Sequence, residues 1–295
     1  MSKVSIVIPN WNGREKLEKN LPAVFEVVGV GEVIIVDDAS EDSSVNFIQS
    51  TYPKIKLFVQ LKNRGFSTTV NKGVSEAKEE FIFLLNSDAI PSRDSLKSAL
   101  SFFSDEKVFS VSCNTGGSWS WAYFTDGYFW HYMAPKVSES HQTLWSSGGS
   151  AIFRKSVWEE LGGLDENFNR FYEEDMDLGY RATKRGYLNI WDPNSLVEHS
   201  KQKGVIQENF TPKEVARVAQ RNQLLFIWKN IHDKKMIARH IVALFRNLIT
   251  HPSYVGVVLS AAAKLPSILS ERRVEIENAK LTDQEILSKF SYNNR

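Results

Sequence analysis

Four short apolar runs, rich in β-branched residues, recur within the first ninety residues, and polar segments with helical spacing separate them. The runs are VSIVIP at 4–9, EVIIVDD at 32–38, IKLFVQ at 55–60 and FIFLLNSD at 81–88. Runs of this length are typical of strands buried on both faces of a sheet, and their alternation with helices is typical of βαβ units. The pattern therefore predicts an α/β fold with a largely parallel sheet.

Polar side chains follow these runs, where each predicted strand ends. In open α/β sheets, ligands bind outside the carboxyl ends of the strands. We therefore expect one crevice to gather these residues, which are Asn10, Asn12, Asp37, Asp38, Asn63, Asn86 and Asp88.

Composition excludes several classes of function. The chain has 295 residues, of which 42% are hydrophobic, enough for one large α/β domain with an appendage or for two modest domains. A formal net charge of +1 lacks the basic excess typical of nucleic-acid binding, so no nucleic-acid partner is expected. The single Cys113 excludes an intrachain disulfide and reads as a core thiol. The first nine residues lack the features of a signal peptide, which favours a cytoplasmic location.

The pattern changes along the rest of the chain. Residues 111–205 include an aromatic stretch (118–132), a strand with the sequence SAIFR and a short helix ending at Gly162 and Gly163. After about residue 206 the spacing is helical, with one apolar face predicted at Ile237, Ile241, Leu244, Phe245 and Leu248. The uncharged stretch 247–263 contains Pro252 and is too short to span a bilayer. Its helix either packs on its own domain or lies on an anionic membrane surface.

Acidic residues at two strand ends, the pair Asp37 and Asp38 and the single Asp88, suggest ligand chemistry. Adjacent carboxylates at Asp37 and Asp38 can accept hydrogen bonds from a pyrimidine ring and from ribose hydroxyls, although Asp is also a common turn former. Asp88 follows a buried strand, where a carboxylate can hold Mg²⁺ or Mn²⁺ that neutralises a diphosphate. The alternative for Asp88 is a solvated turn before Pro91.

Four acids within five residues, Glu173 to Asp177, precede a helical stripe formed by Leu178, Ala182 and Tyr187. Acids in a first turn stabilise the helix dipole, but four exceed what capping needs, and a catalytic base requires a rigidly held carboxylate. His199 follows the predicted strand LNIWD and a turn at Pro193 and Asn194; alone, such a histidine is usually structural. The helix opening at Asn63 to Phe66, which carries Asn71 and Gly73, offers amide groups to a phosphate or sugar.

Together these residues resemble the family 2 glycosyltransferases, the large inverting group with the GT-A fold, and within it the rhamnosyltransferase-like members. The resemblance covers about residues 4–205. Its motifs are VSIVIPNWN, VIIVDDAS, NRGFSTTVNKG, FLLNSDAI, GGSAIFRKSVWEELGGLDENF, FYEEDMDLGYR and the VEHS near 200.

The resemblance implies a role for each matching position. Pro9, Asn10 and Asn12 correspond to the first nucleotide loop, and Asp37 and Asp38 to the base and ribose contacts. Asn63, Gly65 and Asn71 would line the nucleotide and donor sugar, with Asn86 and Ser87 beside them. Asp88 resembles the last Asp of the D-x-D motif and His199 the later histidine of the metal shell. Asp175 matches the general base. The first D-x-D position is Asn86, which removes one charge from the expected metal site.

The implied activity is transfer of a sugar, with inversion, from a nucleotide diphosphate sugar such as dTDP-rhamnose or a UDP-sugar. The acceptor would be a hydroxyl of a cell-surface polysaccharide or lipid-linked precursor. A nucleotidyltransferase and a catalytically inactive sugar-nucleotide binding module remain as alternatives, and a homodimer stays open.

The expected organisation is a GT-A domain over 1–205 and a helical region over 206–295, the domain dividing into a nucleotide-sugar half (1–110) and an acceptor half (111–205). Within the acceptor half, we expect exposed rings of the segment from Trp119 to Tyr132, such as Trp119 and Trp121, to contact the acceptor. The alternative is that these rings cover the sheet or form a subunit interface.

Overall fold

The computed structural model describes residues 3–199 and 204–292. Its first part alternates strands and helices as predicted, and each of the four apolar runs forms a strand. The elements are β1 (Val4–Asn10), α1 (Arg14–Glu26), β2 (Val30–Asp37), α2 (Ser44–Thr51), β3 (Lys56–Val59), α3 (Phe66–Glu76), β4 (Phe81–Leu85), β5 (Ala89–Pro91) and α4 (Ser95–Phe102).

The middle of the chain adds further strands and a hairpin. It comprises β6 (Val108–Asn114), β7 (Ser120–Thr125), β8 (Tyr128–Met133), β9 (His141–Thr143), β10 (Ser150–Arg154), α5 (Lys155–Glu160), the 3-10 helix η1 (Glu166–Phe168), α6 (Glu174–Lys184) and β11 (Leu188–His199). Strands β7 and β8 pair only with each other and form a separate two-stranded ribbon.

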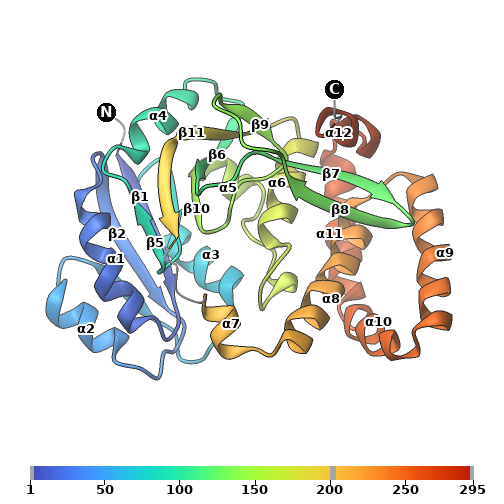
Figure 1. The fold of residues 1–295 in the computed structure, drawn as a ribbon, viewed down its shortest axis with the longest axis horizontal. Coiled ribbons are helices and arrows are strands. Elements are labelled where there is room, and N and C mark those ends of the chain that lie inside the picture. The colour runs from blue at the N-terminus through green and yellow to red at the C-terminus, as the bar shows by residue number, and fades with distance from the viewer. Residues whose placement is uncertain (1–2, 200–203, 293–295) are drawn as a thin grey trace.

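The remaining strands form one sheet in the order β3-β2-β1-β4-β10-β6-β11-β5, with β9 also paired to β11. Strands β1 to β4 are parallel. Strand β10 is antiparallel to both β4 and β6, so β6 and β11 point the same way as β1 to β4. The parallel strands therefore bring their carboxyl ends to one edge of the sheet, which confirms the predicted α/β class (Figure 1).

Alternating side chains of the buried strands enter two apolar clusters, one on each face of the sheet. In β1, Ile6 and Ile8 join the cluster covered by α1 and α4, whereas Val7 joins the cluster covered by α3, α5 and α6. Burial on both faces explains why these strands read as continuous apolar runs. Cys113 lies buried in the first cluster, as predicted.

Helices follow the sheet, in agreement with the predicted helical region. They are α7 (Val205–Asn209), α8 (Pro212–Asn230), α9 (Lys234–Thr250), η2 (Pro252–Tyr254), α10 (Val255–Ala262), α11 (Leu265–Asn278) and α12 (Asp283–Lys289). Capping boxes start α8 at Thr211 and α12 at Thr282. Helices α8 to α12 gather around the β7–β8 ribbon, at the end of the molecule opposite α2 (Figure 1). A third apolar cluster joins them to α6 and the ribbon.

One local prediction was wrong and another holds only in part. The turn expected at Pro193 and Asn194 lies within β11, whose register with β6 shifts between Asp192 and Leu196. Helix α9 packs Ile237, Leu244 and Leu248 of its predicted apolar face against the third cluster, whereas Ile241 and Phe245 are exposed and His240 is buried. Trp228 Nε1 donates to His240 Nε2 at 3.0 Å, and His240 Nδ1 lies 2.7 Å from the Gly127 carbonyl oxygen. These polar contacts turn the histidine inward.

In the parts of the chain that the structure describes, no single helix is long and apolar enough to cross a bilayer. Helix α9 and the segment Pro252–Ala262 meet the length and composition criteria only as a pair, bent by 119°.

Candidate functional site

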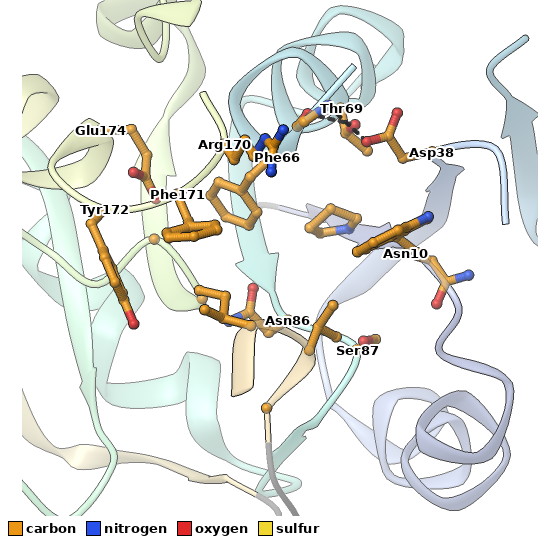
Figure 2. A pocket seen from close by; sticks show the side chains of 18 of the residues that line it. Asn10, Asp38, Phe66, Thr69, Asn86, Ser87, Arg170, Phe171, Tyr172 and Glu174 are labelled. Atoms are coloured by element: carbon orange, nitrogen blue, oxygen red, sulfur yellow. Dashed lines mark hydrogen bonds between the residues drawn. The ribbon is translucent and has the colours of Figure 1, made fainter. Parts of the chain in front are cut away.

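A cavity of about 680 Å³ lies outside the carboxyl ends of the parallel strands. Segments from β1, β2, β4, α3 and α6 contribute to its wall (Figure 2). The predicted crevice therefore exists. The predicted site residues that line it are Pro9, Asn10, Asp38, Asn63, Gly65, Asn86, Ser87, Asp88 and Asp175.

Asp38 occupies one end of this cavity and is held by the loop before α3. Its carboxylate accepts hydrogen bonds from the backbone N–H groups of Arg64 at 2.7 Å and Gly65 at 2.8 Å, and from Gln60 Nε2 at 2.9 Å. Burial raises the pKa of the Asp38 carboxyl above its ordinary value. This network fixes the loop at 63–65 against the end of β2, so both segments face the same space.

Asp37 and Asn12 lie behind the lining of the cavity. Asp37 is fully buried and accepts hydrogen bonds from Asn10 Nδ2 at 2.7 Å and from the backbone N–H of Ser40 at 2.8 Å. Asn12 Oδ1 accepts from the backbone N–H of Glu41 at 2.8 Å. Both residues therefore stabilise the loops that carry Asn10 and Asp38.

Asn71 and Gly73 also differ from their predicted positions, since neither lines the cavity. Asn71 Nδ2 donates to the Leu164 carbonyl oxygen at 2.7 Å, and its Oδ1 accepts from the Leu164 N–H at 2.9 Å. A Cβ at Gly73 would lie 2.4 Å from Val7 Cγ1, so glycine here allows α3 to approach the sheet. In the structure, Asn71 links α3 to the loop after α5.

Asp88 and His199 come together although 111 positions separate them in the sequence. Strand β5 pairs antiparallel with the end of β11 and places His199 opposite Ala89. His199 Nδ1 lies 3.6 Å from Asp88 Oδ1, and this imidazole lowers the pKa of the Asp88 carboxyl. Ser200, the last residue of the VEHS motif, lies outside the described residues.

Asp88 and His199 together could hold a divalent cation whose other coordination positions are filled by a bound ligand. The described residues contain no cluster of three or more His, Cys, Asp or Glu side chains suited to a metal ion. One carboxylate and one imidazole leave most coordination positions for phosphate oxygens and water, which is how Mg²⁺ and Mn²⁺ are often held at nucleotide sites. Asp88 and His199 therefore fit the predicted metal role.

Asp175 lies in the first turn of α6, and two backbone amides hold its carboxylate. Oδ2 accepts from the N–H of Gly148 at 3.1 Å, and Oδ1 accepts from the N–H of Met176 at 2.8 Å. Burial raises the pKa of this carboxyl, and the nearby Glu173 charge raises it further. A carboxylate that is rigidly held and half-buried, with its pKa raised toward neutral pH, has the properties of a general base.

The neighbouring acids of α6 differ from one another. Glu174 lines the cavity, and burial raises its pKa well above the ordinary value. Asp177 points away from it and is fully buried, with Arg181 Nε at 2.8 Å and Asn230 Nδ2 at 2.7 Å from its oxygens. Of the four acids, Asp177 therefore has a structural role.

Arg64 and Phe66 line the cavity and belong to the helix opening that was expected to meet a phosphate or sugar. Sequence reasoning missed other lining residues, namely Trp11, Arg170, Phe171, Tyr172, Val205, Ile206 and Phe210. Trp11 is adjacent to predicted residues and could have been included on that ground. No local signal marks Arg170 or helix α7, because they reach the cavity from loops that tertiary contacts position.

The loop that carries Arg170 and Tyr172 is held by helix α8. Asn222 is fully buried, and its Nδ2 donates to the carbonyl oxygens of Phe168 at 2.7 Å, Phe171 at 3.0 Å and Tyr172 at 2.9 Å. A side chain from the C-terminal helical region thus fixes the backbone that leads into Asp175.

The aromatic segment forms the β7–β8 ribbon and is mostly packed. Trp119 is 8% exposed and stacks on His141 with ring centroids 4.1 Å apart, so the expectation that it is exposed was wrong. Phe129 is buried against Phe226 of α8 at 4.7 Å. His131, also in this segment, lines a second cavity, and Asp175 is part of the wall of that cavity as well.

Known sequences that are similar to this chain are those of glycosyltransferases. The model of the family "Glycosyl transferase family 2" matches residues 5–162, just over half of the chain. An O-antigen chain rhamnosyltransferase, RfbN of Salmonella typhimurium, is 25% identical over 226 residues, covering 72% of this chain and 68% of that protein. An N-acetylglucosaminyl-diphospho-decaprenol L-rhamnosyltransferase of Mycobacterium tuberculosis is 24% identical over 208 residues. That match covers 57% of this chain and 66% of the mycobacterial protein.

Solved structures show the same fold at low sequence identity. A mannosyltransferase from Pyrobaculum calidifontis, determined in complex with GDP-Man and Mn²⁺, superposes with a TM-score of 0.56 at 17% identity. The match covers 94% of this chain and 86% of that one. This likeness confirms the GT-A fold.

Proposed function

Because the chain belongs to the family 2 glycosyltransferases, we propose that it transfers a sugar from a nucleotide diphosphate sugar to an acceptor hydroxyl with inversion. The donor is dTDP-rhamnose or a UDP-sugar. One observation carries the proposal: the fold brings Asp38, Asp88 and Asp175, from three distant segments, to the wall of one cavity. The low-identity rhamnosyltransferase relatives favour rhamnose as the transferred sugar.

In this reaction, Asp175 accepts the proton of the acceptor hydroxyl while the acceptor oxygen attacks the anomeric carbon. The bond from that carbon to the diphosphate oxygen breaks on the opposite face, and the nucleoside diphosphate leaves with the electron pair. The amides of Gly148 and Met176 hold the Asp175 carboxylate in place. Proton removal by a positioned base contributes typically about 10² to 10⁴ in rate.

At the other end of the cavity, Asp38 and the loop at 63–65 bind the nucleoside, and Arg64 and Arg170 provide positive charge for the diphosphate. Asp88 and His199 would hold Mg²⁺ or Mn²⁺. When bound, such an ion supplies charge stabilisation to the leaving diphosphate. Asn86 leaves the metal with one fewer carboxylate than a D-x-D pair would give.

The acceptor is proposed to be a saccharide on a lipid carrier, met at the inner face of the cell membrane. Helices α9 and α10 carry an exposed apolar patch, termed the α9–α10 patch, formed by Ile241, Val242, Phe245, Ile249, Val255 and Leu259. Residues 234–270 contain no Asp or Glu but include Lys234, Lys235, Arg239, Arg246 and Lys264. Apolar side chains beside basic ones suit an anionic lipid surface.

The membrane proposal is tested by sedimentation with vesicles containing anionic lipid. We expect the wild type to bind, and Val242→Asp with Phe245→Asp to reduce the bound fraction at least about fivefold, because charges oppose insertion of apolar side chains. Loss of a dimer in the double variant, without any vesicle binding by the wild type, would assign the patch to a homodimer interface instead.

Glycosyl transfer itself is tested with a panel of dTDP-, UDP- and GDP-sugars in the presence of Mg²⁺ or Mn²⁺. We expect one class of donor to bind by calorimetry and to be hydrolysed slowly without acceptor. Binding without any hydrolysis or transfer would indicate an inactive sugar-nucleotide binding module. Release of pyrophosphate from a nucleoside triphosphate and a sugar phosphate would indicate a nucleotidyltransferase.

A further inference from the structure

A second cavity, of about 390 Å³, adjoins the catalytic end of the first one. The two share Tyr172, Glu174 and Asp175. The additional wall residues of the second cavity come from distant parts of the chain: His131 from β8, Trp145, Glu173, Met176 and Ala219 from α8. Asp175 therefore lies between two spaces, and only the first contains the nucleoside and diphosphate groups proposed above.

Two buried carboxylates in the second cavity have oxygen atoms without a hydrogen-bond partner. They are Glu173 Oε2 and Glu174 Oε2, on side chains that are about nine-tenths buried. A buried acceptor without a partner costs about 1–3 kcal/mol, so its retention in a cavity wall points to a ligand that donates hydrogen bonds. Hydroxyl groups are such donors.

The charges of the second cavity distinguish it from the first. Three carboxyl groups, Glu173, Glu174 and Asp175, face one imidazole, that of His131, whose Nε2 lies 3.5 Å from Glu173 Oε1. The first cavity contains Arg64 and Arg170, and neither of them lines the second one. An anionic group would be repelled in the second cavity, whereas a neutral polyol would not.

Aromatic side chains complete the second cavity. His131 packs edge-on against Trp145 with ring centroids 5.1 Å apart, and Tyr172 lies beside Glu174. Flat apolar faces next to hydrogen-bond acceptors match a sugar ring, which presents C–H faces and a rim of hydroxyls.

We propose that the second cavity binds the acceptor as a neutral sugar unit, without a carboxylate or phosphate on that unit, and presents one of its hydroxyls to Asp175. This inference rests on the proposed function. Glu173 and Glu174 accept hydrogen bonds from other hydroxyls, and Trp145 supports the ring. The acidic wall selects against uronic acids and phosphorylated sugars. The acceptor proton passes to Asp175, as in the transfer step described above.

The test compares matched neutral and acidic glycosides, octyl glucoside with octyl glucuronide and octyl galactoside with octyl galacturonide. Ligand-observed NMR below the micelle concentration measures their binding to the full chain. We expect at least one neutral glycoside to bind at least about tenfold more tightly than its acidic partner, since like charges at close range are strongly disfavoured. Equal binding within each pair, or binding of none, overturns the inference.

Two variants locate the binding in this cavity. Glu173→Gln should reduce the discrimination against the acidic glycosides at least about threefold, because it removes a charge and keeps the shape. Trp145→Ala should weaken the binding of the neutral glycosides about tenfold. The matched control is Trp121→Ala. The sequence placed Trp121 in a segment expected to contact the acceptor, but its indole packs on Tyr123 and Tyr132 and lines neither cavity, so binding should not change. Wild-type behaviour of both cavity variants overturns the assignment.

The failure of this inference is distinguishable from failure of the proposed function. The NMR measurement requires neither donor nor turnover, whereas donor binding and hydrolysis require no acceptor. If the protein binds a nucleotide sugar but no neutral glycoside, only the proposal for the second cavity is overturned. If it selects neutral glycosides but binds no nucleotide sugar, the proposed reaction is overturned and the proposed sugar site remains.

Discussion

The two ends of helix α6 differ in whether their charged side chains have partners of opposite charge. At its amino end, Glu173, Glu174 and Asp175 face cavities, and two of the three carboxylates have unpartnered oxygens. Along the rest of the helix, Asp177 and Lys184 are buried, and each has an oppositely charged side chain within 3 Å. A buried carboxylate without a partner costs free energy, whereas one that is paired with a cation holds its helix to the neighbouring elements. The contrast separates the part of α6 that meets ligands from the part that holds it in place.

The anchoring part faces a seam of ion pairs with the C-terminal helices. Lys229 of α8 lies 2.7 Å from Asp165, 3.2 Å from Asp177 and 2.8 Å from Glu271 of α11. Lys184 lies 2.7 Å from Asp283 of α12, which also accepts from Tyr180. Because α6 carries the candidate base at its other end, this seam sets the position of Asp175 from a distance.

The largest expected effect is the loss of stability when one of these ion-paired residues is replaced. Lys229→Met should lower the free energy of unfolding by about 3–5 kcal/mol, because it leaves Asp165 buried without a cation and Asp177 with Arg181 alone. Urea denaturation measures the change. Lys235→Met, at an exposed position of α9, is the control and should change stability by less than about 0.5 kcal/mol. Equal stability of the two variants would remove the seam's proposed role.

The next effect concerns the cavity end of α6. Asp175→Asn should keep donor affinity and reduce turnover by roughly 10² or more, since the amide cannot accept the proton. Steady-state kinetics and donor calorimetry separate the two quantities. Glu159→Gln, at an exposed position on α5, serves as the control. Turnover close to that of the wild type in Asp175→Asn would assign the base elsewhere.

A smaller effect is expected for the metal residues. Asp88→Ala should weaken binding of the nucleoside diphosphate about tenfold in the presence of Mn²⁺, because an ion that bridges protein and phosphate loses one anchor. With a chelator present, the variant and the wild type should bind alike. Unchanged affinity in Mn²⁺ would contradict the role of Asp88.

The smallest effect is on pH dependence. A general base must be ionised, so turnover falls as pH drops through the pKa of Asp175, which burial raises and Glu173 raises further. His131 has the opposite influence on that pKa, and Glu174 also faces the group. Glu173→Gln should therefore move the acid limb of kcat to lower pH and His131→Phe to higher pH, each by about half a unit or less, as expected for single nearby charges. Shifts in the reverse directions would contradict this arrangement.

The donor side of the site was largely predictable because its signals are local. A buried strand ends and a polar residue follows, as with Asp38 after β2 and Asp88 after β4, and parallel strands bring such residues to one edge. The same reasoning could not separate Asp37 from Asp38. Adjacent residues leave a strand in opposite directions, and which of them reaches the cavity depends on the loops that cover the other.

The acceptor side was less predictable because its contacts join distant segments. His131 reaches Glu173 only through the packing of the β7–β8 ribbon on α8, and Lys184 finds Asp283 across 99 residues. Burial of His240 in place of Phe245 likewise depends on Trp228 and Gly127. Periodicity identified α9 as a helix and could not show which of its faces would be covered.

The three hydrogen bonds from Asn222 to the loop before α6 bear on how this enzyme could be engineered. Asn222 lies sixty residues beyond the family match, in a region whose described residues line the first cavity only at α7 and the residues directly adjoining it. Replacing the C-terminal helices with those of a relative would preserve every carboxylate of the donor cavity and still release the backbone from Phe168 to Tyr172. A chimera must therefore exchange that loop and α8 as one unit, with Asn222 and its three carbonyl partners taken from the same parent.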